Sequence, residues 1–172
     1  GTEGWINIQE TSNSVTGNAN LVATGGTITT SGNFKIHTFT GPGTFTVCQV
    51  SSTAADNTVS YVVVAGGASG GSAQYNAAGG GGAGGFREYK GPADCYTASP
   101  LDGNPGGTAV TVTAQAYPIT VGAGGASVTG NGTDGNNGSN SVFSTVTSTG
   151  GGAGTAGNAA PPANPGGSGG GA

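Results

Sequence analysis

Residues 79–85 read GGGGAGG, residues 130–138 read GNGTDGNNG, and residues 151–157 read GGAGTAG. Each stretch places a glycine at every third position. That spacing is the period of the polyproline II helix, which has three residues per turn. A glycine at every third residue gives such a helix a bare edge, so neighbouring helices can approach closely and hydrogen-bond through their backbones. The three stretches therefore predict a packed polyglycine II helix bundle that needs few large side chains.

The residues expected at the packing edges are all glycines of these three stretches: Gly79, Gly82, Gly85, Gly132, Gly135, Gly138, Gly151, Gly154 and Gly157. A flexible linker is the alternative reading of glycine-rich sequence. Two observations weigh against a linker. The stretches alternate with strand-like sequence, and they combine Gly with Ala and Asn where linkers favour Gly and Ser.

The composition excludes several classes of protein. The 172 residues include 39 Gly, and only 6% are charged, against roughly 25% in ordinary domains. With three cationic side chains and a net charge of −4, no electrostatic binding to nucleic acid is expected. No apolar run approaches the ~20 residues that a membrane-spanning helix needs, so no membrane insertion is expected. Disorder usually requires a high net charge, which this chain lacks.

Two strand-like runs flank the turn sequence Gly41-Pro42-Gly43, namely residues 33–40 and 44–50. Their Thr, Val, Ile and Phe content predicts a hairpin with a three-residue loop. In that register position 36 faces position 48, and one face is expected to be the core face. The residues on that face are Phe34, Ile36, Thr38, Thr46, Cys48 and Val50.

Further strands are expected at residues 58–65, 108–115, 117–121 and 142–147, the first of them buried on both faces at its end. No amphipathic helix of ten or more residues is evident. The predicted fold is therefore mainly β with an irregular glycine-rich part. It consists of short antiparallel strands or hairpins joined to the packed polyglycine II helix bundle, with essentially no α-helix.

A series of motifs in fixed order carries a family resemblance. The motifs are TITTSGNFKIHTFTGPGTFTV (27–47), YVVVAGG (61–67), GGAGGFREYK (81–90), YPITVGAGG (117–125) and GSNSVFSTVTSTGGGAG (138–154). Together they resemble the glycine-rich domain of tailed-phage tail-fibre and virion structural proteins, of the kind found in marine phages and cyanophages. The resemblance covers residues 23–172. The start, GTEGWINIQETSNS, is similar to the end of a fibre-shaft module, so residues 1–22 are expected to be a shaft end or linker.

The resemblance implies a virion surface protein in the distal part of a tail fibre, outside the cell. It would attach to the host surface by binding a receptor, either a glycan or an outer-membrane protein, without covalent chemistry. The upstream fibre shaft is an expected partner, and homo-oligomers are expected, with the trimer favoured. A subunit of a secreted extracellular filament or surface structure is the alternative. An ice-binding protein ranks lower, because the glycine triplets carry mixed side chains and not a regular Thr or Ala ladder.

Residues 86–107 form the chemically richest segment, with five of the ten charged residues of the chain. Tyrosine beside charges on a loop suits recognition, because Tyr offers a large contact area and a hydrogen bond at low entropic cost. The alternatives are a structural loop, or a strand with exposed charges at residues 87–90. The receptor-binding candidates are Arg87, Glu88, Tyr89, Lys90, Asp94, Tyr96 and Asp102.

The cysteines, the histidine and Asp134 do not form the pattern of a metal-binding or catalytic site. Cys48 and Cys95 are the only cysteines, and free thiols are favoured because phage proteins fold in a reducing cytosol. His37 is the only histidine, and with two distant cysteines it lacks the paired spacing of a zinc site. Asp134 lies in a stretch that reads as a turn-rich Asn/Gly loop. The sequence therefore predicts no metal, no cofactor and no enzymatic activity.

Overall fold

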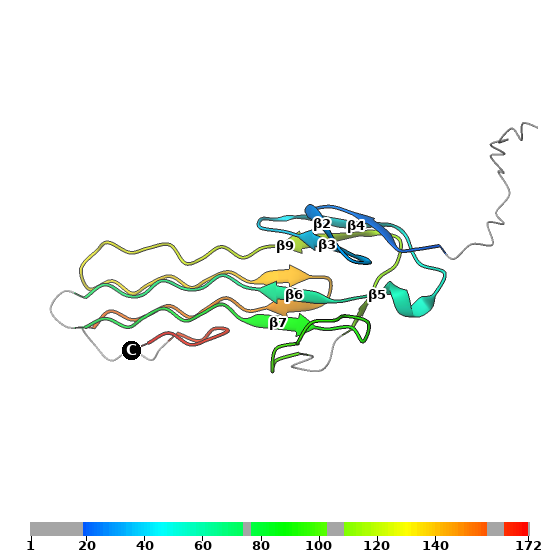
Figure 1. Ribbon diagram of the computed structural model, residues 1–172. Helices are drawn as coiled ribbons and strands as arrows, with labels where there is room; N and C mark the ends of the chain where they lie inside the picture. Colours follow the sequence, from blue (N-terminus) through cyan, green and yellow to red (C-terminus); the bar gives the residue numbers. More distant parts are fainter. Residues whose placement is uncertain (1–18, 74–76, 103–108, 158–163, 172) are drawn as a thin grey trace, which may run out of the picture.

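The computed structural model describes residues 19–73, 77–102, 109–157 and 164–171 (Figure 1). These residues form short strands and one 3₁₀ turn, so the predicted mainly β fold without α-helices is confirmed. The elements are β1 Val22–Thr24, β2 Thr27–Ser31, β3 Phe34–Thr38, β4 Gly43–Gln49, η1 Ala54–Asn57, β5 Thr58–Val59, β6 Tyr61–Val64, β7 Phe86–Tyr89, β8 Val110–Thr111, β9 Ala116–Thr120, β10 Ser141–Phe143 and β11 Val146–Ser148.

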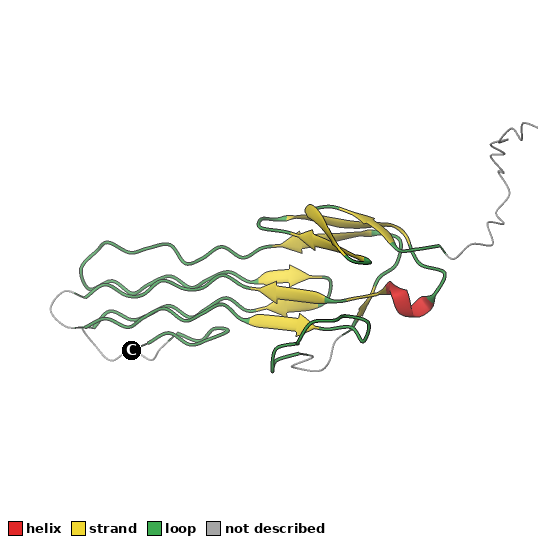
Figure 2. Ribbon diagram, viewed as in Figure 1, coloured by secondary structure: helices red, strands yellow, loops and turns green. Residues whose placement is uncertain are grey.

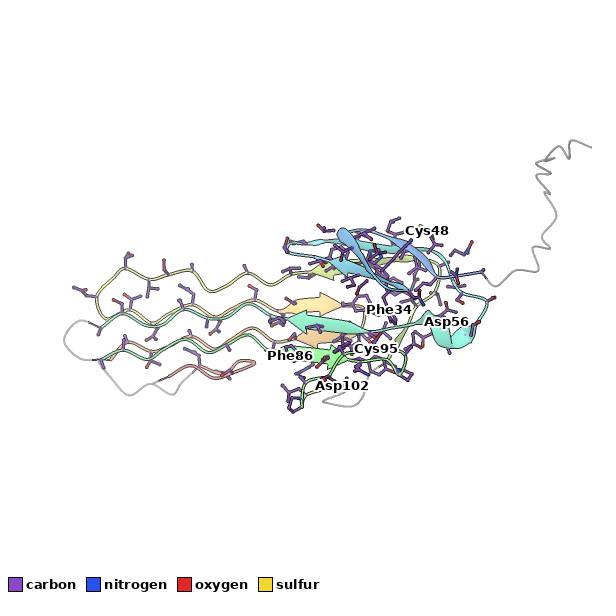
Figure 3. The ribbon with its side chains drawn as sticks, in the orientation of Figure 1. Phe34, Cys48, Asp56, Phe86, Cys95 and Asp102 are labelled. Carbon is purple, nitrogen blue, oxygen red and sulfur yellow. The ribbon has the colours of Figure 1, made fainter. Side chains whose placement is uncertain are left out.

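The molecule has two differently built parts, which Figure 2 separates by colour. The strands gather at one end, which we call the β half. From it, long segments without regular secondary structure run side by side to the other end (Figures 1 and 2). Figure 3 shows that long side chains crowd the β half, whereas the extended segments carry short ones.

The β half contains one five-stranded antiparallel sheet, in the order β1-β4-β9-β10-β11, and three two-stranded sheets, β2-β3, β5-β8 and β6-β7. In the large sheet Phe45 lies opposite Tyr117, and Val47 lies opposite Ala23. The core is a cluster of buried side chains from these sheets: Ala23, Phe45, Val47, Val63, Val110, Val112, Tyr117 and Val146.

The predicted hairpin of residues 33–40 with 44–50 is wrong. β3 pairs with β2 instead, with Ser31 opposite Phe34, and β4 pairs with β1 and β9. The turn between β2 and β3 is the dipeptide Gly32-Asn33, with Gly32 at a φ of 56°. Two-residue loops of type Gly-Asn are a hairpin signal, because the first residue must adopt a left-handed conformation. The chain therefore forms its hairpin at Gly32-Asn33, and Gly41-Pro42-Gly43 connects β3 to β4 without making a hairpin.

The predicted core face of this region is also reversed. Ile36 is 48% exposed and Cys48 is exposed, whereas Phe45 and Val47 on the opposite face are 7% and 2% exposed. The reason is the pairing of β4 with β9, which turns Phe45 and Val47 toward the other core side chains. Cys48 therefore does not pack as a small core residue.

Three other strand predictions need correction. Residues 58–65 split into β5 and β6, and only one face of β6 is buried, because Val62 and Val64 are each 54% exposed. The run 108–115 contributes only the short strand β8. The run 142–147 is a hairpin of β10 and β11, turned at Ser144, which has a φ of 53°.

The extended segments form what we call the glycine bundle, made of residues 65–72, 79–85, 122–126, 133–140, 149–157 and 164–171. Every residue from Gly150 to Ala156 is buried, so residues 149–157 are its central segment. Residues 122–126 and 133–140 of the surrounding segments expose about two of every three residues. In residues 133–140, for example, Gly135 and Gly138 are half-buried and their neighbours are exposed. In residues 65–72 only Gly67 is exposed. A burial period of three suits a threefold extended chain with one edge facing inward.

Every backbone N–H from Gly150 to Ala156 has an acceptor, and the acceptors lie on three neighbouring segments. Gly151 and Gly154 donate to Gly66 and Ser69 at 2.9 and 3.0 Å. Gly152 and Thr155 donate to the carbonyls of Ser168 and Gly171 at 2.9 and 3.1 Å. The carbonyls of residues 150–155 are accepting as well. The N–H groups from Gly150 to Ala156 and the carbonyls from Gly150 to Thr155 are thus paired, as burial of backbone polar groups requires.

The remaining donors of the central segment bond to side chains. Asp134 Oδ1, Asn137 Oδ1 and Asn140 Oδ1 accept the N–H groups of Ala156, Ala153 and Gly150 at 2.6, 2.7 and 2.9 Å. The three acceptors lie three residues apart, as the donors do. Sequence analysis interpreted Asp134 only as part of a turn-rich loop. The pattern D-x-x-N-x-x-N beside the glycines was the signal that it missed.

Glycine is required where segments approach most closely. A Cβ on Gly154 would overlap the carbonyl oxygen of Gly79, and a Cβ on Gly138 would overlap that of Gly66. The segment pairs also bond at every third residue: Ala65, Ala68 and Gly71 donate to Gly85, Gly82 and Gly79 at 2.9–3.0 Å. The spacing that the sequence shows therefore recurs in both the hydrogen bonds and the close contacts.

Candidate functional site

The receptor-binding candidates gather on β7 and on the segment that follows it, residues 90–102, which lies along the lower side of the β half (Figure 1). Residues 103–107 of the predicted segment lie outside the described residues. Arg87 and Tyr89 are half-buried in β7. The Tyr89 ring stacks on Tyr61 of the neighbouring strand, with 6.2 Å between the ring centroids, and Arg87 Nη1 donates to the Phe86 carbonyl at 3.1 Å.

Glu88 is only 5% exposed, so its carboxylate does not face solvent. Its Oε2 accepts the backbone N–H of Ser99 at 2.9 Å, which fixes the loop over the strand. Hydrogen bonds from Ser99, first from the side chain and then from the backbone, hold the pKa of Glu88 below its usual value of 4.5, although burial acts in the opposite direction. Glu88 therefore positions the loop and is not itself presented to a partner.

Tyr96 is 44% exposed, and its phenol shares a hydrogen bond with Glu88. Desolvation raises the pKa of Tyr96 to about 12, and the hydrogen bond and the negative charges of Glu88, Asp94 and Asp102 contribute to the rise. The phenol therefore stays neutral and can act as a hydrogen-bond donor throughout the physiological pH range.

The two aspartates of the segment are engaged inside the loop. The Ser60 hydroxyl and the Gly91 N–H both donate to Asp94 Oδ2, the latter at 3.1 Å. Asp102 Oδ1 accepts the backbone N–H of Lys90 at 2.8 Å. Side-chain acceptors that bond backbone donors in this way stabilise a particular loop conformation. Asp94 and Asp102, like Glu88, thus serve to fix the shape of residues 90–102.

Tyr96 and Leu101 are exposed on this segment, and Lys90 is half-buried. We call these three residues the loop surface: Lys90, Tyr96 and Leu101. Lys90 Nζ lies 5.7 Å from the centroid of the Tyr96 ring, within the range of a cation–π contact. Leu101 is 47% exposed. Sequence analysis did not single out Leu101, nor the anchoring roles of Ser60 and Ser99, because nothing in the local pattern distinguishes these residues from ordinary loop positions.

The predicted packing glycines occupy several environments. Gly79, Gly82, Gly85, Gly151 and Gly154 are buried in the glycine bundle. Gly135 and Gly138 are half-buried and donate to the central segment at 2.8 and 2.9 Å. The other two lie at chain turns or segment ends: Gly132, which has a φ of 67°, and Gly157.

No metal-binding group of three His, Cys, Asp or Glu side chains occurs in the part of the chain that the structure describes. His37 has a structural environment, because its Nδ1 lies 2.8 Å from the Gly25 carbonyl and its ring packs edge-on against Phe45 at 5.0 Å. Cys48 and Cys95 are both free and exposed, and they lie well apart (Figure 3). Among the described residues, no helix is long and apolar enough to cross a membrane.

Comparison with known proteins gives one positive finding. No curated protein and no solved structure matches the chain. A family model described as a glycine-rich domain matches residues 38–172, which include β4 to β11, the loop surface and the whole glycine bundle. On this evidence the chain belongs to the glycine-rich domain family.

Proposed function

We propose that the chain is the distal domain of a phage tail fibre, exposed on the virion, and that it attaches the particle to a host surface by non-covalent receptor binding. The observation that carries this proposal is the loop surface. Tyr96 and Leu101 are exposed and Lys90 is half-buried on a loop whose shape is fixed by hydrogen bonds to Glu88, Asp94 and Asp102. The setting rests on the ordered resemblance of the sequence to tail-fibre proteins.

The chemistry of the loop surface suits recognition. A partly exposed Tyr ring, an aliphatic side chain and an ammonium group offer apolar contact together with a charged hydrogen-bond donor. A loop held by internal hydrogen bonds loses little conformational freedom when it binds, which favours affinity. A glycan or an outer-membrane protein could supply the matching polar and apolar groups. No bond is made or broken, so no cofactor is required.

In the same proposal the glycine bundle is a set of polyglycine II helices that stiffens the domain, with Gly79, Gly82, Gly85, Gly135, Gly138, Gly151 and Gly154 at its packing edges. The period of three in burial and hydrogen bonding supports this reading. Residues 23–172 form the domain, the upstream segment joins it to a fibre shaft, and the copies assemble as a homo-oligomer, for which the resemblance favours a trimer.

Binding of the fluorescently labelled chain to whole cells tests the attachment function. We would screen a panel of cyanobacterial and other marine bacterial strains by flow cytometry. On a strain that binds, Tyr96→Ala and Lys90→Ala should each weaken binding by about tenfold or more, as expected for residues at the centre of an interface. Lys35→Ala is the matched control, because Lys35 is the other lysine of the chain and lies on β3.

The outcomes separate this function from its main rival. Binding that depends on Lys90 and Tyr96 but not on Lys35 would support attachment through the loop surface. Equal binding by all variants would contradict it. Growth of the purified chain into open filaments visible by electron microscopy would instead favour a subunit of an extracellular filament, because an interface that does not close generates fibres.

A further inference from the structure

The β2-β3 hairpin is the least covered element of the β half. All of β2 and nearly all of β3 is exposed, and only His37 is half-buried. The three large apolar residues of the hairpin are among those most exposed: Ile28 at 45%, Phe34 at 42% and Ile36 at 48%. Strand β4 of the large sheet differs from the hairpin in its burial, because Phe45 and Val47 are buried on one of its faces.

Both faces of the hairpin carry apolar side chains. Because directly opposed residues of an antiparallel pair share a face, Phe34 and Ile36 lie on one face with Thr29, and Ile28 lies on the other with His37. An isolated two-stranded hairpin is marginally stable in water, and three or more strands are needed for independent stability. The β2-β3 hairpin therefore resembles a two-stranded sheet that further strands would complete.

The outer edge of β2 lacks the features that normally prevent strand pairing. Natural edge strands are protected by charges, proline, bulges or a covering segment. β2 reads Thr27-Ile28-Thr29-Thr30-Ser31, without charge, proline or glycine, and it pairs on one side only, with β3. β3 carries Lys35, the one charged residue between Thr27 and Thr38. The unprotected edge is thus β2 and not β3.

We propose that β2 pairs with β2 of a second copy of this chain, antiparallel about a two-fold axis, to form a continuous four-stranded sheet. An uncharged edge is complementary to an identical edge, and antiparallel pairing of identical strands closes after two copies. In the central register Thr29 faces Thr29 of the partner subunit. On one face of the joined sheet Ile28 is then the diagonal neighbour of Ile28 of the partner subunit, whereas Phe34 and Ile36 stay on the outer strands.

The position of the hairpin is compatible with this assembly. In Figure 1 the hairpin lies above β6, whereas residues 90–102 lie below it. Joining two copies through β2 therefore leaves both loop surfaces accessible. The inference does not depend on what the loop surface binds, and it differs from the trimer that the family resemblance implies.

The test uses the full chain and measures its mass in solution by sedimentation over a wide concentration range. The wild-type chain is expected to reach a dimer. Thr29→Lys should raise the dimer dissociation constant by about tenfold or more, because like charges directly opposite each other destabilise a strand pair. Thr147→Lys is the matched control, since Thr147 is an exposed strand threonine of β11 with the same change of charge. Circular dichroism checks that both variants keep the wild-type fold.

A mixing experiment makes the test specific for the interface. Thr29→Asp should also dissociate alone, and an equal mixture of Thr29→Asp and Thr29→Lys should form dimers again through opposite charges. A wild-type chain that stays monomeric at all concentrations, or that forms trimers, would overturn the proposal. So would equal dimerisation of the Thr29→Lys and Thr147→Lys variants.

Discussion

The interior of the β half and the interior of the glycine bundle consist of different groups. In the β half, strands bring Phe45, Val47 and Val112 into contact, and the core consists of side chains. In the glycine bundle the central segment is buried from Gly150 to Ala156, yet its largest side chain is a threonine. Its neighbours are backbone atoms of other segments. The comparison teaches that a buried core needs close packing and satisfied hydrogen bonds, and that large side chains are only one way to achieve these.

The two interiors should also lose stability through different kinds of substitution. A side-chain core tolerates the loss of a methyl group by partial collapse, at a cost that depends on the remaining cavity. Backbone in contact with backbone has no side chain that can move aside. The glycine bundle should therefore be damaged most by the addition of atoms, and the β half by their removal.

The largest effect is expected for an added methyl group in the glycine bundle. Gly79→Ala places a Cβ on the carbonyl oxygen of Gly171, and we expect it to reduce the free energy of unfolding by about 3 kcal/mol. Gly80→Ala is the matched control, because a Cβ there meets no atom within 4 Å. Thermal unfolding of both variants gives the measurement. Equal stability of the two would mean that the bundle is not packed through its backbone.

In the β half, Val112→Ala should reduce the free energy of unfolding by about 2 kcal/mol, because it removes buried methyl groups from a position that is 1% exposed. Val64→Ala, at 54% exposure, should change it by no more than about 0.5 kcal/mol. Chemical denaturation measures both. A smaller loss for Val112→Ala than for Val64→Ala would contradict the assignment of the core.

The side-chain acceptors of the glycine bundle come next. Asn137→Ala leaves the buried N–H of Ala153 without its acceptor, and we expect a loss of about 1–2 kcal/mol in the free energy of unfolding. Asn137→Asp keeps the accepting oxygen and should lose less. Amide hydrogen exchange at Ala153 provides the direct measurement. Unchanged exchange in Asn137→Ala would show that the contact does not protect this amide.

The smallest effect concerns the loop and depends on pH. Because the pKa of Glu88 is lowered in the folded chain, its contribution is present above the usual value of 4.5 and is lost as the pH falls through the lowered pKa. We expect the protection of the Ser99 amide, which donates to Glu88, to fall toward the unprotected limit as the pH drops below 4.5, while amides of the central segment stay protected. In Glu88→Gln this pH dependence should disappear. Identical pH profiles for wild type and Glu88→Gln would exclude Glu88 as the anchor.

Much of the glycine bundle could be read from the sequence, because its repeat is local. A glycine every third residue specifies which edge of a segment can approach a neighbour, whatever that neighbour is. The sequence did not show in the same way which groups bond to each other across the bundle. The spacing of Asp134, Asn137 and Asn140 suggests side-chain acceptors at every third residue, but it does not show that they bond to Ala156, Ala153 and Gly150.

The loop after β7 also combines features that the sequence predicted with features that it did not. Composition alone directed attention to residues 86–107, where charge and tyrosine are concentrated. It could not show that Glu88 is buried or that Leu101 is exposed, since both depend on how residues 96–102 fold back over β7. Pairing of this kind joins positions that are distant along the chain, as when Ser60 bonds to Asp94.

By itself, the sequence determined the class of the molecule, the period of the glycine segments and the absence of long helices from the part of the chain that the structure describes, because these follow from residue type and spacing. Only the tertiary structure decided which strand pairs with which, which face of β4 is the core, and which acidic side chains are enclosed. The choice between the Gly32-Asn33 and Gly41-Pro42-Gly43 turns illustrates the reason. Both are good turns locally, and the pairing of β4 with β9 selected between them by burying Phe45 and Val47.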